Sequence, residues 1–396
     1  MTGSTELAWE DRMLPRVDNW DLVTRRERAL RQQPYRAAIP ARIAQLGFVV
    51  PQQTLADADD AARAIARFDA EYEDFPEPFS GVLLRSESAS SSEIEHLTAG
   101  ARAISEAEID ERVTGNAPQI VRNVRAMEAA VALADDIGHD TVIAMHRELL
   151  DDVTPDLVGR YREEQVWIGG ALPHLAAFVP PHHDRVVAAM DDLIAFTTRT
   201  DLPLLVQAAV AHAQFETIHP FPDGNGRTGR ALVQAILRRG GLLRHLTIPV
   251  SSGILTDVDA YFGALDAFRT GRVAPIVDVF SAASLSGLRN AERLAAEIRA
   301  LVARWDDRLT GIRSDATARK VVRLSIEHPV LNARLVAERT GASPPVITNA
   351  FDQLVQRGLL RPGNSRQRNR IWVNDDVVDA LDAFAERSGR RQQPGY

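Results

Sequence analysis

The chain has 396 residues, enough for two or three domains, and its 45% apolar and 25% charged residues are ordinary for a globular protein. A net charge of -8 excludes a surface that attracts nucleic acid everywhere, so any such contact needs a local basic patch. The absence of cysteine excludes disulfides, thiolate zinc sites and cysteine nucleophiles, and the lack of a signal-peptide core or a membrane-spanning apolar run favours a cytoplasmic protein.

The first half of the chain contains two predicted helices and one segment of another kind. Apolar residues recur at helical spacing over Ala58–Tyr72 and again over Ile120–Val131. Two short strand-like runs, Gln165–Ile168 and Ala177–Val179, flank a glycine turn and end at a pair of prolines. A small β-hairpin over Gln165–Pro181 is therefore expected.

Three further helices follow the hairpin. Leu204–Phe215 is apolar on nearly every side, so this helix should be central and buried. Thr228–Arg239 and Ala291–Arg308 also show helical spacing, and Gly240 marks the end of the first of these. Together these elements predict an all-α fold with a small β-hairpin.

A compact unit follows a linker at Leu309–Thr317. Ala333–Thr340 and Pro344–Arg357, joined by a short turn, predict a helix-turn-helix. A predicted hairpin behind it has a basic tip that carries Arg361, Arg366, Arg368 and Arg370. This order indicates a winged helix, whose arginines could follow a DNA backbone. Winged helices also dock proteins or form homodimers, so DNA, a partner protein and a second copy of the chain all stay open.

The most informative stretch runs from His219 to Arg230 and reads His-Pro-Phe-Pro-Asp-Gly-Asn-Gly-Arg-Thr-Gly-Arg. Gly224 and Gly226 permit backbone angles that turn successive amides into one concavity. The predicted helix behind them directs its positive end to the same place, where a phosphate chain would bind.

Charged side chains complete this stretch. Arg227 and Arg230 are three residues apart, so both can reach phosphate oxygens. Asp223 offers a carboxylate of the kind that Mg²⁺ prefers. Histidine ordinarily titrates near neutrality, so His219 could take a proton from an attacking hydroxyl. The alternative is a turn between two helices with a chance histidine, but it does not explain the whole combination.

The stretch matches, at every specified position, the signature of the Fic (filamentation-induced-by-cyclic-AMP) family, His-x-Phe-x-Asp/Glu-Gly-Asn-Gly-Arg-x-x-Arg. The resemblance implies a helical core that binds ATP and Mg²⁺, with His219 as the base and Asp223 as the metal ligand. The residues that it implies at the nucleotide are Gly224, Asn225, Gly226, Arg227, Thr228, Gly229 and Arg230.

Two more features resemble the family. The hairpin Gln165–Pro181 is similar to the flap on which such enzymes lay an extended target segment by strand addition; a purely structural hairpin is the alternative. Tyr261 resembles an aromatic residue placed near the adenosine in relatives, with core packing as the alternative.

The segment from Ser91 to His96 resembles the family's autoinhibitory helix, Ser/Thr-x-x-x-Glu-Gly/Asn. The resemblance implies that Glu95 pairs with Arg230 and blocks productive placement of the γ-phosphate. The sequence departs from the pattern at His96, where glycine or asparagine is usual. Ser92-x-x-Glu95 also has the form of a capping box at a helix N-terminus, which is the alternative interpretation.

The resemblance implies a protein adenylyltransferase that moves AMP from ATP onto a serine, threonine or tyrosine hydroxyl of a target protein, itself included. The predicted parts are residues 1–115 with the inhibitory helix, the Fic core at 116–308 and a winged helix at 318–388. A nucleotide-sensing DNA-binding regulator and a Fic enzyme that removes AMP are the alternative functions.

Overall fold

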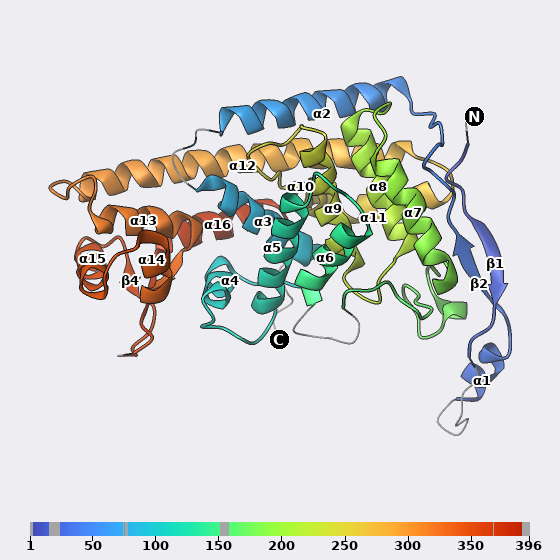
Figure 1. Ribbon diagram of the computed structural model, residues 1–396, viewed down its shortest axis with the longest axis horizontal. Helices are drawn as coiled ribbons and strands as arrows, with labels where there is room; N and C mark the ends of the chain where they lie inside the picture. The colour runs from blue at the N-terminus through green and yellow to red at the C-terminus, as the bar shows by residue number, and fades with distance from the viewer. Residues whose placement is uncertain are drawn as a thin grey trace. The chain divides into compact units, whose positions relative to one another are not determined.

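The computed structural model describes residues 3–15, 24–73, 75, 78–150, 158–366 and 368–389. The molecule is mostly helical with small antiparallel sheets (Figure 1), so the predicted fold class is confirmed. Within the described ranges, no helix is both long and apolar enough to cross a membrane.

The chain forms two compact units, each assembled from three separate segments. The first unit comprises residues 1–62, 129–242 and 259–281, and the second comprises 63–128, 243–258 and 282–396. The domain ranges expected from the sequence are contiguous, and they stay predictions. Two of the unit boundaries fall inside long helices, α2 (Gln52–Glu71) and α12 (Ala274–Arg308).

The first unit contains a strand pair and a group of helices. Its elements are β1 (Ala8–Arg12), α1 (Arg25–Arg31), β2 (Tyr35–Ile39), α6 (His139–Leu150), η3 (Pro173–Leu175), η4 (His183–Arg185), α7 (Val186–Thr197), α8 (Leu204–Ile218), α9 (Asn225–Arg239) and α11 (Val258–Arg269). α8 is the centre, because every residue from Leu205 to Ile218 is buried. Its packing against α9 and α7 fits the apolar surface expected on all its sides.

The strands of the first unit differ from those expected. β1 and β2 form an antiparallel pair, with Ala8 opposite Ile39, that the sequence analysis did not predict. The expected hairpin is reduced to a single antiparallel bridge between Ile168 and Phe178, and η3 occupies its loop. A hydrogen bond from the Ala38 amide to the Val179 carbonyl, at 3.0 Å, joins β2 to this segment.

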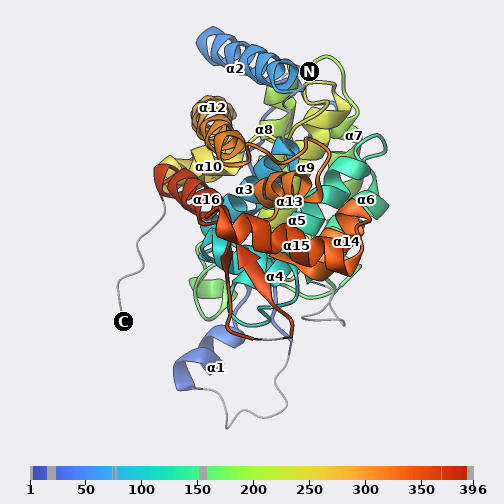
Figure 2. The ribbon, with the colours of Figure 1, turned by 90° about the vertical axis from the view of Figure 1, so that its left-hand side faces the viewer.

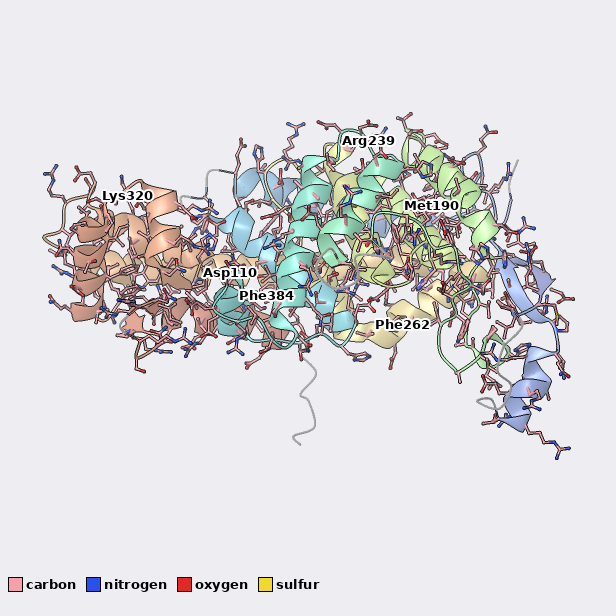
Figure 3. The ribbon with its side chains drawn as sticks, turned by 60° about the horizontal axis from the view of Figure 1, so that its bottom comes forward. Asp110, Met190, Arg239, Phe262, Lys320 and Phe384 are labelled. Carbon is pink, nitrogen blue, oxygen red and sulfur yellow. The ribbon has the colours of Figure 1, made fainter. Side chains whose placement is uncertain are left out.

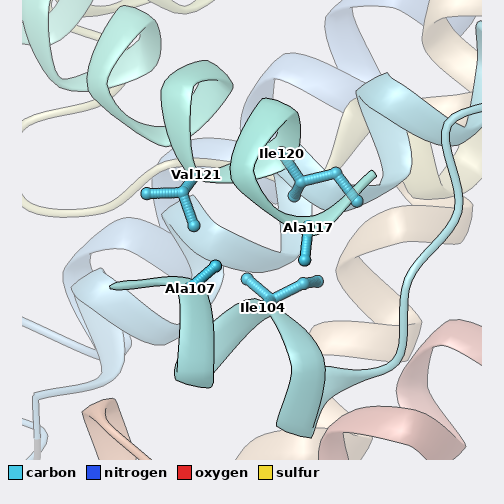
Figure 4. Packing of buried hydrophobic residues seen from close by; sticks show 5 residues of the cluster. All are labelled: Ile104, Ala107, Ala117, Ile120 and Val121. Carbon is cyan, nitrogen blue, oxygen red and sulfur yellow. The ribbon is translucent and has the colours of Figure 1, made fainter. Parts of the chain in front are cut away.

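The second unit is helical apart from a short sheet. Its elements are α3 (Phe79–Ile94), α4 (Ala101–Glu108), α5 (Ala117–Ala132), α10 (Val250–Ile254), η5 (Leu255–Asp257), α13 (Thr317–Glu327), β3 (Val330–Asn332), α14 (Ala333–Thr340), α15 (Pro344–Gln356), β4 (Arg361–Pro362), β5 (Ile371–Val373) and α16 (Asp375–Arg387). Figure 4 shows how Ile104 and Ala107 of α4 pack against Ala117, Ile120 and Val121 of α5.

The C-terminal domain, residues 317–387, carries the sheet. Its three strands lie in the order β3-β5-β4, all antiparallel, and Figure 2 shows α13, α14 and α15 grouped together. The ring of Trp372 in β5 stacks on Phe351 of α15, with centroids 3.7 Å apart, so the sheet is packed against the helices. The described elements follow the order that the winged-helix interpretation requires.

Candidate active site

α8 ends at the histidine that the sequence analysis singled out as a base. His219 is the C-cap residue of α8 and has a left-handed backbone with φ of 51°, which few residues with a side chain adopt. Its amide donates to the Phe215 carbonyl at 2.8 Å. Such strained conformations concentrate at functional sites, and the imidazole keeps 19% of its surface exposed.

The loop between α8 and α9 is held in shape by its own amide side chain and by α6. The Asn225 side-chain oxygen accepts from the Phe221 amide at 2.9 Å, and its nitrogen donates to the Phe221 carbonyl at 2.8 Å. The Phe221 ring stacks on His146 of α6, with centroids 3.7 Å apart. His146 Nε2 donates to the Asp223 carbonyl at 3.1 Å. Asn225 and His146 therefore fix the loop that precedes α9.

Only one of the two expected glycine positions has an unusual backbone. Gly224 has a φ of 76°, and a Cβ there would lie 2.8 Å from a methyl carbon of Leu149 in α6. Gly226 is the second residue of α9 and is not among the residues with positive φ. The expectation that both glycines have unusual backbone angles is thus wrong at Gly226, because this residue already belongs to helix α9.

The N-terminus of α9 is suited to an anion. The amides of Asn225, Gly226 and Arg227 have no acceptor within the helix, and the positive end of the helix dipole lies there. Arg227 and Arg230 are 4% and 3% exposed, so both guanidinium groups lie under the surface at this end.

Two more signature residues face the interior. Thr228 is fully buried. A Cβ at Gly229 would lie 3.0 Å from the Phe215 ring and 3.2 Å from His212 Nδ1. Gly229 therefore permits the close packing of α9 on α8, and its predicted part in nucleotide binding would be through the backbone.

Asp223 fits a magnesium ion that arrives with a nucleotide. Its side chain is 72% exposed and lies 3.8 Å from Arg227, and its Oδ1 accepts from the Gly224 amide at 2.7 Å. Among the described residues, no group of three or more histidine, cysteine or carboxylate side chains could hold a metal. Mg²⁺ is commonly bound by one or two carboxylates together with substrate phosphates, so one exposed carboxylate at an anion site suffices.

The histidines at the site are held neutral. Burial, with smaller contributions from the nearby Arg162 and Arg269 charges, lowers the pKa of His219 to about 3. Burial likewise lowers the pKa of His146 to about 4. A neutral imidazole at His219 can accept a proton, as a general base must.

The segment from Gln165 to Pro181 has features that support a flap. Gln165 Nε2 donates to the Pro180 carbonyl at 3.0 Å, which closes the base of the segment. Phe178 packs with Leu7 and Ala38, and the guanidinium carbon of Arg269 lies 3.8 Å from the centre of its ring. The use of this segment for a target peptide stays a prediction.

Tyr261 belongs to the core. It is 1% exposed, and its hydroxyl lies 2.8 Å from His212 Nε2. Contact with an adenosine would require its neighbours to move. The exposed aromatic residue of this part of α11 is Phe262, which is 49% exposed and labelled in Figure 3.

Glu95 lies at the C-terminus of a helix. It is the exposed C-cap residue of α3, and the next residue, His96, has a left-handed φ of 63°. The amides of His96 and Leu97 donate to the Glu93 and Ser92 carbonyls, the bonds of a Schellman motif. The capping-box interpretation is therefore wrong, because Ser92 is in the last turn of α3. The usual glycine or asparagine at position 96 suits its left-handed backbone. The pairing of Glu95 with Arg230 stays a prediction.

Three residues of the site were missed by the sequence analysis. Arg162 and Arg269 flank His219, and His146 supports the signature loop. They come from a loop, α11 and α6, far from the signature in sequence. Only the helical spacing of α6 and α11 could have placed His146 and Arg269 near a core.

The comparisons with known proteins agree with this geometry. Residues 136–237 match the model of the Fic/DOC family, and residues 55–132 match the model of that family's N-terminal part. A protein adenylyltransferase fic-1 of Caenorhabditis elegans is 32% identical over 143 residues, which are 36% of this chain and 26% of that protein. A protein adenylyltransferase Fic of Nematostella vectensis is 35% identical over 108 residues, 27% of this chain and 24% of that protein.

The matched region thus spans about a quarter of the length of these curated relatives. Among solved structures, a Fic family protein of Desulfovibrio desulfuricans G20 superposes with a TM-score of 0.51 at 23% identity. The superposition covers 80% of this chain and 95% of that one. At this identity the likeness shows a shared fold.

Proposed function

Because this chain carries a Fic/DOC domain together with the N-terminal domain of that family, we propose that it is a protein adenylyltransferase. It transfers AMP from ATP to a hydroxyl side chain of a target protein. One observation carries the proposal: three features lie next to one another between the end of α8 and the first turns of α9. They are a neutral, partly exposed His219, the exposed carboxylate of Asp223, and the N-terminus of α9 with its two arginines.

The chemistry follows from these groups. The phosphates of ATP bind at the first-turn amides of α9, with Arg227 and Arg230 as counter-charges. His219 Nδ1 is buried and lies 3.8 Å from a carboxylate oxygen of Glu216, so a target hydroxyl could not reach it. We therefore assign the base to Nε2. The target hydroxyl oxygen attacks the α-phosphorus as Nε2 takes its proton. The bond from that phosphorus to the bridging oxygen breaks, and pyrophosphate leaves.

Asp223 would hold the Mg²⁺ that accompanies ATP. Bound there, the ion would neutralise phosphate charge as pyrophosphate departs. The protein's own part is to orient the reactants. The paired hydrogen bonds of Asn225 and the ring of His146 keep the loop in place, so that His219 can act on the target hydroxyl while α9 holds the phosphates.

Intact-mass analysis tests this function. The wild type and Glu95→Gly are incubated with Mg²⁺ and each of the four nucleoside triphosphates, and the expected result is a gain of one AMP moiety with ATP. His219→Ala should bind ATP and melt like the wild type, yet its transfer rate should fall roughly 100- to 10,000-fold, because the base is lost and the anion site stays.

The same assay separates the alternatives. A nucleotide sensor would bind ATP without gaining mass in any variant. An enzyme that removes AMP would gain no mass and would instead release AMP from modified protein. Transfer at the wild-type rate by His219→Ala would contradict the assignment of the base.

A further inference from the structure

We propose that Arg162 is a positioning residue that fastens both ends of the flap, residues 165–181, to the backbone of His219. No part of the signature contains this residue. The inference rests on the proposed function of His219 as the base, and it adds the means by which base and flap are kept in one arrangement.

The contacts of Arg162 carry the proposal. Its Nε donates to the His219 carbonyl at 2.8 Å, and one terminal nitrogen donates to the Glu164 carbonyl at 2.9 Å. The other terminal nitrogen donates to the carbonyls of Pro181, at 2.5 Å, and Ile218, at 3.4 Å. The guanidinium thus joins the residue before the flap, the last residue of the flap and the end of α8.

The end of α8 needs such a partner. The last carbonyls of a helix have no amide partner within it, and the left-handed backbone of His219 prevents the chain from continuing the helix. Arg162 is 4% exposed, so its donors replace water at the Ile218 and His219 carbonyls. Its own amide donates to the Pro220 carbonyl at 2.9 Å, which adds a third link to the same turn.

An arginine is required by this geometry. Its planar fork presents five donors in fixed directions, whereas lysine presents three from a single point. Burial lowers the pKa of Arg162 to about 10, so the group keeps its charge at neutral pH. Within the part of the chain that the structure describes, the other charged groups that face His219 are Arg269 from α11 and Glu216 from α8.

Two variants separate the hydrogen bonds from the charge. Arg162→Lys keeps the cation and loses the fork, and Arg162→Gln loses both. Arg160→Gln is the matched control, because Arg160 lies on the same segment and its side chain is 59% exposed, 3.9 Å from Glu163. Each change is made in the wild type and in Glu95→Gly.

Hydrogen exchange measured by mass spectrometry gives the first readout. Both Arg162 variants should exchange faster at the flap and at residues 215–224 together, with the rest of the chain and the control unchanged. The transfer rate of Arg162→Lys should fall about 10- to 100-fold, since a small misplacement of a reacting group has effects of that size. The KM for ATP should change little, because the α9 anion site is not touched.

Titration of the histidine rings by NMR gives the second readout, with the His219 signal assigned by its loss in His219→Ala. A nearby cation disfavours the imidazolium, so Arg162→Gln should raise the pKa of His219 and move the acid limb of the transfer rate to higher pH. Arg162→Lys should keep that limb in place.

Unchanged exchange at both segments in both variants would overturn the proposal, as would faster exchange at the flap without the His219 turn. A general loss of protection across the chain would mean that Arg162 acts on overall stability and would also overturn it. If no protein transfers AMP, the wild type included, the proposed function fails, whereas exchange and ring titration still decide on Arg162.

Discussion

The proton affinity of His219 is set by its surroundings, which would change if a nucleotide were bound at α9. Burial and the charges of Arg162 and Arg269 keep the ring neutral in the protein alone. A triphosphate at α9 brings negative charge close to the ring, which favours the imidazolium. We therefore expect the pKa of His219 to rise on binding, toward the range in which a general base is effective.

Asp223 should determine the requirement for metal. In Asp223→Asn the amide oxygen can still accept from the Gly224 amide, so the loop should keep its shape while the ion loses a charged ligand. Activity should fall about tenfold or more and should recover partly as Mg²⁺ is raised. A Mg²⁺ titration of the transfer rate measures this.

Asp201→Asn is the control for this titration, since it removes an exposed carboxylate that pairs with Arg199 at a distance from the signature in sequence. Coincident Mg²⁺ curves for Asp223→Asn and the wild type would contradict the metal assignment. Full activity of the wild type in excess chelator would do the same.

At the scale of elements, α3 is anchored by buried polar groups. The Glu87 carboxylate accepts from the amide and the hydroxyl of Ser251, at 2.9 and 2.7 Å. Asn123 of α5 donates to the Ser88 carbonyl at 2.8 Å and to the Ser92 hydroxyl at 3.2 Å. A buried acceptor that loses its partner costs about 1–3 kcal/mol, so these bonds fix the rotation of α3 and hence the side from which Glu95 projects.

Replacing Glu95 tests the predicted inhibition. If the carboxylate restrains Arg230, Glu95→Gly should raise self-labelling with ATP roughly tenfold, the scale of a typical coupling between sites. Glu95→Gln should do the same without the added backbone freedom of glycine. The rate of AMP incorporation, measured with melting temperature, checks this.

The position of Glu95 simplifies this experiment. It lies at the C-cap of α3, so neither variant removes an N-terminal cap, and any loss of stability should be about 1 kcal/mol at most. Glu73→Gln removes an exposed carboxylate of the same unit and is the control. Labelling that stays at the wild-type level in both Glu95 variants would refute inhibition by this residue.

At the scale of the whole molecule, the C-terminal domain is bound to α4 and to the residues that follow α4, within the second unit. Arg366 pairs with Glu111 at 3.1 Å, and Arg334 pairs with Asp110, labelled in Figure 3, at 2.9 Å. Asp382 of α16 accepts from the Ala101 amide at the start of α4, at 3.0 Å.

Two more arginines near the basic tip have partners within the domain. Arg361 pairs with the Asp375 carboxylate, which offsets its charge, and Arg370 keeps its charge but lies over the ring of Trp372. The helix that would enter a DNA groove, α15, contains no lysine or arginine. The domain therefore offers less positive charge to DNA than its sequence suggests.

We expect the full chain to bind random duplex DNA only at low salt. A triple variant with Arg366→Gln, Arg368→Gln and Arg370→Gln should bind DNA more weakly. The slope of log affinity against log salt should fall by roughly one unit for each phosphate that is no longer neutralised. Glu111→Gln should strengthen it, because Arg366 then has no acidic competitor at that position. Fluorescence anisotropy over a salt series measures all three proteins.

A triple change of Arg25, Arg26 and Arg28 to glutamine controls for net charge, since these arginines are exposed on α1. Equal weakening by both triple variants would assign the effect to charge alone. No binding by any protein at low salt would leave protein docking or self-association as the role of the domain.

The sequence alone determined what is local. The signature from His219 to Arg230 brings base, carboxylate and anion site together because they are neighbours in the chain, and helical spacing located α8, α14 and α15 within a few residues. Such features need no knowledge of distant contacts.

The tertiary structure decided everything that depends on residues far apart. Arg162 reaches the His219 carbonyl across 57 positions, and His146 reaches the Asp223 carbonyl across 77. The pairing of β1 with β2 and the burial of Tyr261 against His212 also depend on residues that are far apart in the sequence. No local pattern encodes these contacts, because they form only when packing removes water from polar groups. Each buried donor or acceptor then needs a partner, and the fold supplies that partner from a distant part of the chain.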